Sequence, residues 1–226
     1  MQALVVAAFA PELEEFQRLA PDVATAAVGV GLVDAALGTA EALARARPDV
    51  LLLLGTCGWF DYLGAEDPRV IVATEIVLAD GGAAEGRAAL VGGVGEALRA
   101  SPALVDACAS RGAAPATVAT TLSVSIDDAL ATALAADLAS RCAASARGVE
   151  HLEAYAVFRA AERAGVPCAA VLGVANRVGA GGRAAWAAHH VEASALAAGV
   201  VARALADGAI ADALRTTTRG RSPEPG

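Results

Sequence analysis

One stretch decides the fold: VEHLEAYAVFRAAERAGVPCAAVLGVANRVGAGGRAAW, Val149–Trp186. It predicts a helix over 150–164, then a tight Gly-Val-Pro turn and a buried strand over 167–174. In an α/β sheet, ligands bind outside the carboxyl ends of the strands. The two ends of this αβ unit are expected to bring Glu153 and Asn176 to one such edge, which makes this pair the centre of the predicted site.

Outward from this unit, buried strands and helices alternate along the chain. We predict strands over 2–8, 23–28, 50–54, 69–78 and 116–125, a loop over 80–95, and helices that begin near 11, 32, 101, 127 and 184. Alternation without a break in composition is typical of one α/β domain. The expectation is a single-domain three-layer sandwich over residues 1–214, with a mixed central sheet flanked by helices. A polar, Pro/Gly-rich tail over 215–226 is predicted to be disordered.

Composition restricts the partners. The chain has 226 residues, 56% of them hydrophobic, which suits one packed domain. Its net charge is −8, so we expect neither nucleic-acid binding nor attraction to anionic membranes. The apolar run Val50–Leu54 is too short to cross a bilayer.

The cysteines and the first residues favour a cytoplasmic protein. Cys57, Cys108, Cys142 and Cys168 form no CxxC pair and no zinc spacing with the histidines, so we predict free buried thiols and no metal site. The opening MQALVVAAFAPELEEF lacks the basic region of a signal peptide.

Polar features follow the predicted strand ends. Glu12 follows the first strand, although an acid at a helix start also stabilises the helix dipole. Gly29 and Gly31 allow close backbone approach, but Asp34 breaks a GxGxxG dinucleotide pattern. The segment 55–58, Gly-Thr-Cys-Gly, offers N–H groups and a hydroxyl to a sugar or phosphate, or is an ordinary β-turn.

Several residues also have plain structural interpretations. Glu153 can be a solvent-facing helix acid, and Asn176 a turn residue at a strand end. His151 can hydrogen-bond at a helix start or line a sugar pocket. Trp186 is expected in the core, while His189 and its neighbour are expected at the surface or in an interface.

Four pieces of the chain, in order, resemble the nucleoside phosphorylase and nucleoside hydrolase superfamily. They are AAFAPELEEF, VGVGLVDAALGTA, PDVLLLLGTCGWF, and VEHLEAYAVF followed by GVPCAAVLGVANRVG. The E-x-x-E-A-Y pattern and the ending N-R-V-G, with a tryptophan some residues later, look most like the futalosine hydrolase branch, which cleaves a purine nucleoside in menaquinone biosynthesis.

The resemblance implies a role for each matching residue. Glu12 would orient the attacking water, Glu153 would hold the ribose 2′- and 3′-hydroxyls, and Asn176 would address the purine. Leu152 takes a position, usually methionine, under the sugar. Thr56 and Gly58 would contact sugar and nucleophile, and the neighbouring Cys57, His151 and Ala175 complete the predicted substrate-binding site.

The chemistry of the residues favours a 6-oxopurine and water. An asparagine cannot protonate a leaving base as an aspartic acid can, but its amide complements the C=O and N–H of hypoxanthine. Leu54 stands where several similar phosphorylases carry arginine, so the predicted nucleophile is water, unless Arg69 or Arg87 folds into the site. We therefore expect an N-ribosyl hydrolase that releases hypoxanthine, with futalosine as leading substrate.

The resemblance has departures, and they keep alternatives open. The segment 122–128 lacks the aromatic that stacks on the base in many relatives, and Gly181-Gly182 replaces a more charged pattern. The alternatives are a phosphate-dependent purine nucleoside phosphorylase, a non-catalytic nucleoside-binding homologue and, more weakly supported, a flavodoxin-like protein. No cofactor is implied, apart from phosphate as co-substrate of a phosphorylase. The resemblance implies a homodimer or larger homo-oligomer.

Overall fold

The sheet is built around β3 (Val50–Trp59), every residue of which is buried. This computed structural model describes residues 1–60, 68–92, 94–142 and 148–219. A run of apolar residues without polar alternation forms a strand that is covered on both faces, and β3 fits that rule. It pairs in parallel with β1 (Ala3–Ala7) on one side and with β8 (Cys168–Arg177) on the other.

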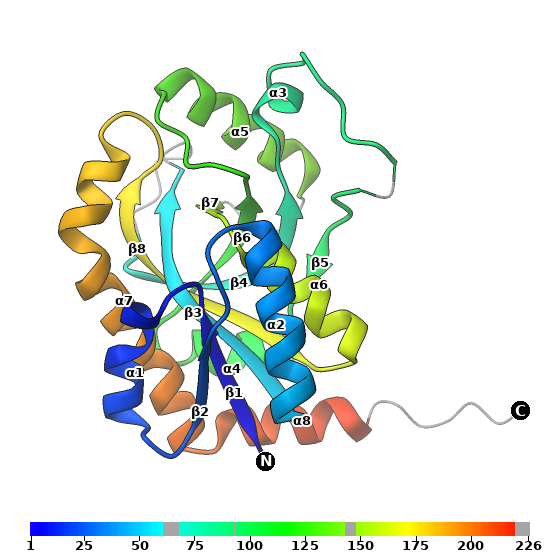
Figure 1. The fold of residues 1–226 in the computed structure, drawn as a ribbon, viewed down its shortest axis with the longest axis vertical. Coiled ribbons are helices and arrows are strands. Elements are labelled where there is room, and N and C mark those ends of the chain that lie inside the picture. The colour runs from blue at the N-terminus through cyan, green and yellow to red at the C-terminus, as the bar shows by residue number, and fades with distance from the viewer. Residues whose placement is uncertain (61–67, 93, 143–147, 220–226) are drawn as a thin grey trace, which may run out of the picture.

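The strand pairings close a ring. From β3 the order runs through β8, β4 (Val70–Leu78), β6 (Ala114–Thr120) and β7 (Gly148–His151), and β7 then pairs antiparallel with the end of β3. Outside the ring, β2 (Ala24–Ala27) extends β1 and the short β5 (Leu98–Arg99) pairs with β4. The sheet is therefore mixed, as predicted, and it curls around the end of β3 (Figure 1).

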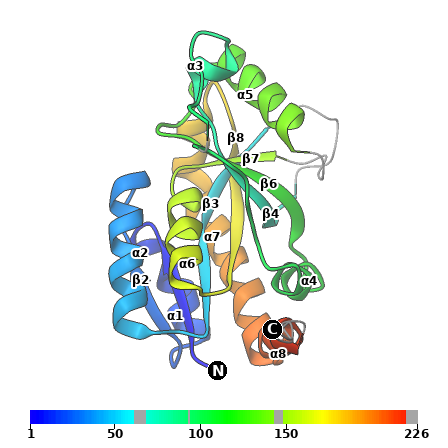
Figure 2. The same cartoon turned by 90° about the vertical axis from the view of Figure 1, so that its right-hand side faces the viewer.

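Helices cover both faces of this sheet (Figures 1 and 2). α2 (Leu32–Ala46) packs with α6 (Ala154–Ala164) on one face, and α7 (Gly182–Ala206) packs on β8 and β3 on the other, with α1 (Glu14–Leu19) beside it. α5 (Asp128–Arg141) encloses a smaller apolar cluster beyond β4 and β6. The layered α/β architecture expected from the sequence is confirmed.

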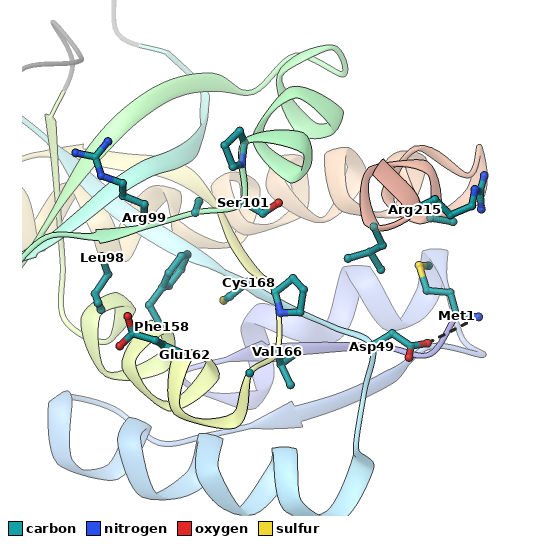
Figure 3. Close-up of a pocket in the computed structure, with 16 residues that line it drawn as sticks. Met1, Asp49, Leu98, Arg99, Ser101, Phe158, Glu162, Val166, Cys168 and Arg215 are labelled. Carbon is teal, nitrogen blue, oxygen red and sulfur yellow. Dashed lines mark ion pairs between the residues drawn. The ribbon is translucent and has the colours of Figure 1, made fainter. Parts of the chain in front are cut away.

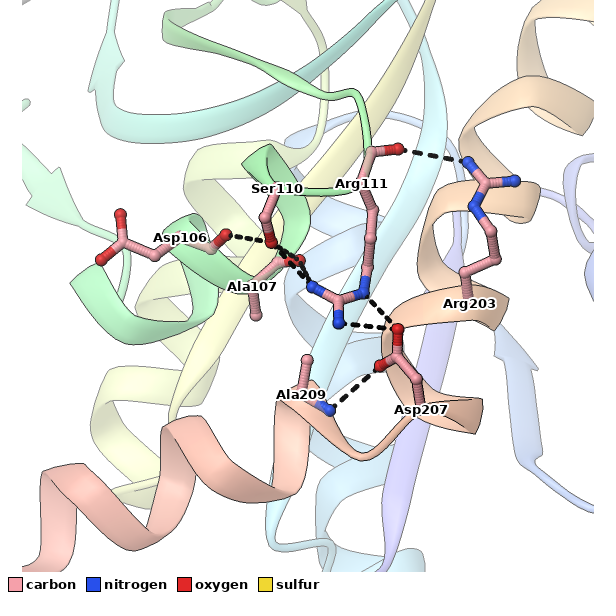
Figure 4. Close-up of polar contacts among 7 residues, drawn as sticks. All are labelled: Asp106, Ala107, Ser110, Arg111, Arg203, Asp207 and Ala209. Carbon is pink, nitrogen blue, oxygen red and sulfur yellow. Dashed lines mark hydrogen bonds and ion pairs between the residues drawn. The ribbon is translucent and has the colours of Figure 1, made fainter.

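An arginine joins the C-terminal helices to α4 (Pro102–Ala109) (Figure 4). Arg111 forms an ion pair with Asp207, at 2.6 Å between Nη2 and Oδ2, and its carbonyl accepts a hydrogen bond from Arg203 on α7. Asp207 also accepts from the backbone N–H of Ala209, the first residue of α8 (Ala209–Arg219). One charged cluster thus fixes the bend between α7 and α8.

The bend between α7 and α8 matters for whether the chain has a helix that could cross a membrane. In the described part of the chain, no single helix has the length and apolarity needed to cross a membrane. α7 and the segment Ala209–Arg215 of α8 meet those requirements only when taken together, across a bend of 62°.

Several predicted boundaries were wrong. Residues 55–58 are not a turn, because β3 keeps pairing with β8 through Trp59 and accommodates a register shift at Cys57/Gly58. The predicted helix over 150–164 begins only at Ala154, because residues 148–151 pair with β6 and β3 as strand β7. The strand predicted over 116–125 spans Ala114–Thr120.

Two further segments differ from the predicted loop and tail. The short helix α3 (Gly81–Ala84) lies within the loop predicted over 80–95. α8 continues to Arg219, into the segment predicted as a tail over 215–226, of which 220–226 lie outside the described residues. Residues 10–13 form a 3₁₀ turn before α1. Pro11, near which a helix was predicted to begin, lies in this turn.

We expect Gly173→Ala to lower the free energy of unfolding by about 3 kcal/mol, because overpacking against backbone cannot relax cheaply. A Cβ at Gly173 on β8 would lie 2.0 Å from the carbonyl oxygen of Ala193 on α7. Gly199→Ala, within α7, is the control: its Cβ would meet only the end of the flexible Arg203 side chain, so helix propensity predicts a slightly stabler protein. Denaturant unfolding measures both, and equal stabilities would contradict the close packing of β8 on α7.

Candidate active site

A cavity of about 420 Å³ lies where β1, β3, β7 and β8 end. Its volume falls in the range of about 300–1,000 Å³ that is usual for small-molecule sites. Nearly all of the predicted site residues line it, and they come from segments far apart in the sequence: Glu12, Thr56, Cys57, Gly58, His151, Leu152, Glu153 and Asn176. The curled sheet therefore brings the predicted carboxylates and the amide to one cavity.

Glu12 lies in the 3₁₀ turn that follows β1 and is 5% exposed. Its Oε1 accepts a hydrogen bond from the hydroxyl of Thr56, at 3.0 Å. Burial raises the pKa of Glu12 to about 7, the negative charge of Glu153 adds to this rise, and the Thr56 hydrogen bond opposes it. β3 approaches this carboxylate closely at Gly55, where a Cβ would lie 3.3 Å from both of its oxygens. Glu12 is thus a buried carboxylate that changes its charge near neutral pH.

Glu153 precedes the first turn of α6 and is 4% exposed. Its Oε1 accepts from the backbone N–H of Gly31 at 2.7 Å, and Gly31 holds a φ of +82° that favours glycine. Gly31, just before α2, therefore holds a carboxylate and not a dinucleotide, in agreement with the broken GxGxxG pattern. The plain interpretation of Glu153 as a solvent-facing acid was wrong.

His151 lines the cavity and accepts hydrogen bonds at the start of α6. Its Nδ1 accepts from the backbone N–H groups of Glu153 and Ala154, both at 3.0 Å, so Nδ1 carries no proton. Burial lowers the pKa of His151, which keeps the ring neutral. The 3.4 Å approach of Nδ1 to Glu153 Oε2 is consequently not an ion pair.

Asn176 lies near the end of β8, in a gap that two glycines leave open. A Cβ at Gly58 or at Gly182 would come within 3.0 Å of its Nδ2. Nδ2 donates to the carbonyl of Arg177 at 2.7 Å, which fixes the orientation of the amide. The Gly181-Gly182 segment, a departure from the resemblance, therefore gives the asparagine room.

Trp186 is not in the core as expected but half-buried on the cavity wall. Its Nε1–H donates to Thr56 Oγ1 at 3.0 Å, so tryptophan, threonine and Glu12 form one chain of hydrogen bonds. His190 stacks on Trp186 with ring centroids 4.3 Å apart, and the ring centroid of Phe9 lies 6.4 Å from that of Trp186. Phe9 and Trp186 are therefore two aromatic side chains on the wall of this cavity.

Glu150 and Ser125 also line the cavity and were missed by the sequence analysis. Glu150 is 6% exposed and accepts from the Ser125 hydroxyl at 2.5 Å and from the Ser125 N–H at 3.1 Å. Burial raises the pKa of Glu150, and the Ser125 hydrogen bonds oppose this rise. Both residues had been placed inside longer elements, which hid their positions at strand ends.

Two predicted features lie elsewhere. Ala175 does not line this cavity but a separate hollow of about 310 Å³, beside Arg69 and His189, because neighbouring residues of a strand point to opposite faces. Arg69 pairs with Glu192, and Arg87 pairs with Glu85, so neither folds into the site. Among the described residues that line the cavity, Arg183 is the one arginine, and it is exposed.

A larger hollow of about 720 Å³ lies at the opposite edge of the sheet, where strands begin (Figure 3). Its charged side chains already have partners within the protein: Arg99 pairs with Glu75, Glu162 with Arg159, and Arg215 with Asp212. The Cys168 thiol there has a pKa raised by burial and is therefore unreactive. The buried carboxylates Glu12 and Glu153, which suit acid–base chemistry, line the cavity at the carboxyl edge of the sheet.

The fold and site define a class: an α/β protein with a cavity lined by buried carboxylates at the carboxyl edge of a curled mixed sheet. The sequence model described as "Phosphorylase superfamily" matches residues 16–211, most of the chain. The protein therefore belongs to the phosphorylase superfamily, as the resemblance predicted. No curated protein matches its sequence.

Solved structures share the fold at low sequence identity. The 5′-methylthioadenosine/S-adenosylhomocysteine nucleosidase of Helicobacter pylori superposes with a TM-score of 0.77 at 14% identity, over 91% of this chain and 98% of that one. The same enzyme from Neisseria meningitidis gives 0.76 at 17%, over 90% and 98%. Futalosine hydrolase of H. pylori gives 0.76 at 14%, over 91% and 97%. These likenesses establish the architecture.

Proposed function

We propose that the protein is a nucleosidase, an N-ribosyl hydrolase that cleaves the N-glycosidic bond of a 6-oxopurine nucleoside. The observation that carries the proposal is that Glu12, Glu153 and Asn176 line one cavity. Membership of the phosphorylase superfamily supports the reaction class, and the nucleosidases among the structural neighbours support hydrolysis. No metal or organic cofactor enters the proposed reaction.

The proposed mechanism separates the two charges that develop as the bond breaks. Positive charge develops on the ribose ring, where the Glu153 carboxylate holds the 2′- and 3′-hydroxyls and stabilises the cation. The base leaves as an anion, which the Asn176 amide stabilises by donating a hydrogen bond to O6 or N7, and it then takes up a proton from solvent. Glu12, with a pKa of about 7, accepts a proton from the water that attacks C1′.

Water is favoured over phosphate by the charges around the cavity. Glu12, Glu150 and Glu153 all line it, and each carboxylate repels a phosphate dianion. Arg183, the one arginine among the described residues that line the cavity, is exposed. Phosphate remains the co-substrate in the alternative, a purine nucleoside phosphorylase.

Futalosine is the leading substrate because it carries hypoxanthine, which suits the Asn176 amide. The test is chromatographic detection of the released base, hypoxanthine from futalosine and inosine and adenine from adenosine, with and without phosphate. We expect release from a 6-oxopurine nucleoside in phosphate-free buffer. An absolute phosphate requirement would overturn hydrolysis in favour of the phosphorylase, and tight nucleoside binding without release from any substrate would support a non-catalytic binding protein.

We expect Thr56→Val to move the acid limb of the pH–rate profile upward by about one to two pH units. The Thr56 hydroxyl lowers the pKa of Glu12 by donating to its charged form, and a hydrogen bond to a charged group contributes about 1.5–3 kcal/mol. Thr56→Ser keeps the hydroxyl and is expected to leave the limb in place. The pH profile of kcat/KM for base release measures this shift. If Thr56→Val and Thr56→Ser have the same acid limb, the ionisation that limits the rate is not that of Glu12.

We also propose that a second copy of this chain covers the cavity rim. Val33 and Leu37 on α2, and Leu122 and Ile126 in the loop after β6, are large apolar side chains between 62% and 77% exposed. Val30 and Val124, next to them in sequence, line the cavity itself, so the apolar surface continues into the site. Such exposed apolar surface marks an interface.

We expect sedimentation to give a homodimer or larger homo-oligomer, and Val33→Asp/Leu37→Asp to shift it to monomer. Wild-type protein that sediments as a monomer at micromolar concentration would contradict this assembly. Glu14→Gln, a change at an exposed position of α1, is the control that should sediment as wild type. A cytoplasmic location, expected from the reduced cysteines, accompanies this proposal and is checked by cell fractionation.

A further inference from the structure

Trp186 is connected to Glu12 through a single hydroxyl group. The indole Nε1–H of Trp186 donates to Thr56 Oγ1 at 3.0 Å, and the Thr56 hydroxyl donates to Glu12 Oε1, also at 3.0 Å. The three residues come from different elements, α7, β3 and the 3₁₀ turn after β1, and α7 packs against the other two. Tertiary packing, and not local sequence, therefore builds this chain of hydrogen bonds.

The donors in this chain all point one way. An indole has a donor and no acceptor, so the Thr56 oxygen can only accept from Trp186, and the one hydroxyl proton is left for Glu12. Thr56 and Glu12 are 8% and 5% exposed. In such buried surroundings, accepting one hydrogen bond strengthens the next one in the chain by about 10–30%. Trp186 thus makes Thr56 a better donor to the Glu12 carboxylate.

The same indole N–H works against a protonated Glu12. For a neutral Glu12 to donate its own proton to Thr56, the hydroxyl proton of Thr56 would have to turn toward Trp186, and the indole cannot accept it. Without the indole N–H this reversed arrangement becomes available, and it stabilises the acid form of Glu12. The indole N–H therefore favours the ionised carboxylate in both protonation states of the site.

Neighbouring rings hold the indole in place. The imidazole of His190 stacks on Trp186 with an angle of 19° between the ring planes, and its Nδ1 lies 3.2 Å from the carbonyl oxygen of Trp186. The ring of Phe9 lies nearby at a tilt of 47°. These contacts restrict rotation of the indole, so that its N–H stays directed at Thr56.

Other groups act on Glu12, and they stay in place when Trp186 is changed. Burial is the largest cause of the raised pKa of Glu12, and the charge of Glu153 adds to the rise, whereas the backbone N–H groups of Thr56 and Ala8 oppose it. Burial and the charge of Glu12 raise the pKa of the Cys57 thiol, so this thiol is neutral. The other titratable or charged side chains at the cavity or stacked on Trp186 are Glu150, His151, Arg183 and His190.

We propose that Trp186 is a positioning residue for Glu12. Its indole N–H sets the direction of the Thr56 hydroxyl proton and so keeps the Glu12 carboxylate ready to accept a proton from the attacking water. The part played in catalysis rests on the function proposed above. The effect on the ionisation of Glu12 does not, because it follows from the hydrogen bonds alone.

Trp186→Phe tests the proposal, because it keeps an aromatic ring beside His190 and removes the N–H. We expect it to raise the pKa of Glu12 by about half a pH unit, less than the shift expected for Thr56→Val, because it weakens a hydrogen bond that Thr56→Val deletes. The acid limb of the kcat/KM profile measures this shift. NMR titration of carboxyl-labelled glutamate measures it without turnover, with the Glu12 signal identified by its loss in Glu12→Gln. Titrations that coincide with wild type would overturn the proposal.

A double-mutant cycle separates positioning from a general structural effect. If Trp186 acts through the Thr56 hydroxyl, Trp186→Phe should add nothing to Thr56→Val, and the double variant should titrate like Thr56→Val alone. Shifts that add would mean that Trp186 acts on Glu12 by another route, and they would refute the assignment. Trp186→3-benzothienylalanine keeps the two fused rings with sulfur in place of the N–H, so it should give the same shift as Trp186→Phe.

Trp59→Phe is the matched control, since it makes the same change at a buried position on β3. Among the described residues the Nε1 of Trp59 has no hydrogen-bond partner, so this variant should leave the titration of Glu12 unchanged. An equal shift in the control would contradict a specific role for Trp186. If no nucleoside releases its base, the function proposed above fails. The NMR titration then still decides on Trp186: a shift in Trp186→Phe that is absent in the Thr56→Val background supports the assignment.

Discussion

Glu12→Gln is expected to lower kcat for base release by about 10²- to 10⁴-fold while making the protein more stable at pH 8. General-base catalysis contributes about this factor, and glutamine keeps the size of the side chain and the acceptor for the Thr56 hydroxyl but cannot take up the proton of water. In wild type, kcat/KM should fall as the pH drops below about 7, where Glu12 becomes protonated. The variant should lose this limb together with the activity.

The stability change has a definite sign. Burial raises the pKa of Glu12 from 4.5 to about 7, so the folded state holds the proton more tightly than the unfolded chain. Ionising the buried Glu12 therefore costs stability. This loss of folding free energy is absent below pH 4.5, grows between 4.5 and 7, and is fully present above 7. At about 1.4 kcal/mol per pH unit it amounts to about 3 kcal/mol, which Glu12→Gln removes.

Denaturant unfolding of wild type and Glu12→Gln at pH 5 and pH 8 measures the effect. The stability gain should be small at pH 5 and near its maximum at pH 8. Glu14→Gln, at the exposed start of α1, is the matched control and should change neither kcat nor stability. A variant less stable than wild type at pH 8 would mean that Glu12 is ionised without penalty in the folded protein.

The strands that decide the layering could be predicted because each is a run of apolar residues bounded by polar ones. β3 and β8 follow that pattern. β7 could not be found this way: Gly148–His151 has no apolar run, and it is a strand because it pairs with β6 and the end of β3. The same long-range pairing explains why Gly55 and Gly58 are in a strand and not in a turn.

The site residues divide in the same way, into those that local sequence reveals and those that depend on long-range pairing. Glu12 and Asn176 were found because the sequence places each beside a predicted strand end, whereas Glu153 came from the predicted αβ unit and from the family resemblance. Glu150 was missed because its position depends on β7, which local sequence does not reveal. Trp186 was wrongly predicted to be in the core. Its hydrogen bond to Thr56 joins residues 130 positions apart, and local sequence does not reveal such a contact.

Replacing Glu153 by glutamine is expected to lower kcat/KM by about 10²- to 10³-fold, the usual effect of removing one group that stabilises developing charge. Glutamine retains the carbonyl that accepts from Gly31 N–H, so the turn before α2 keeps its anchor and the loss reports the missing charge. Substrate analogues locate that charge. Wild type should cleave 2′-deoxyinosine and 3′-deoxyinosine far more slowly than inosine, whereas Glu153→Gln should discriminate weakly, because the carboxylate that grips both hydroxyls is already gone. If the variant penalises the deoxy substrates as strongly as wild type does, the ribose hydroxyls are held by another group.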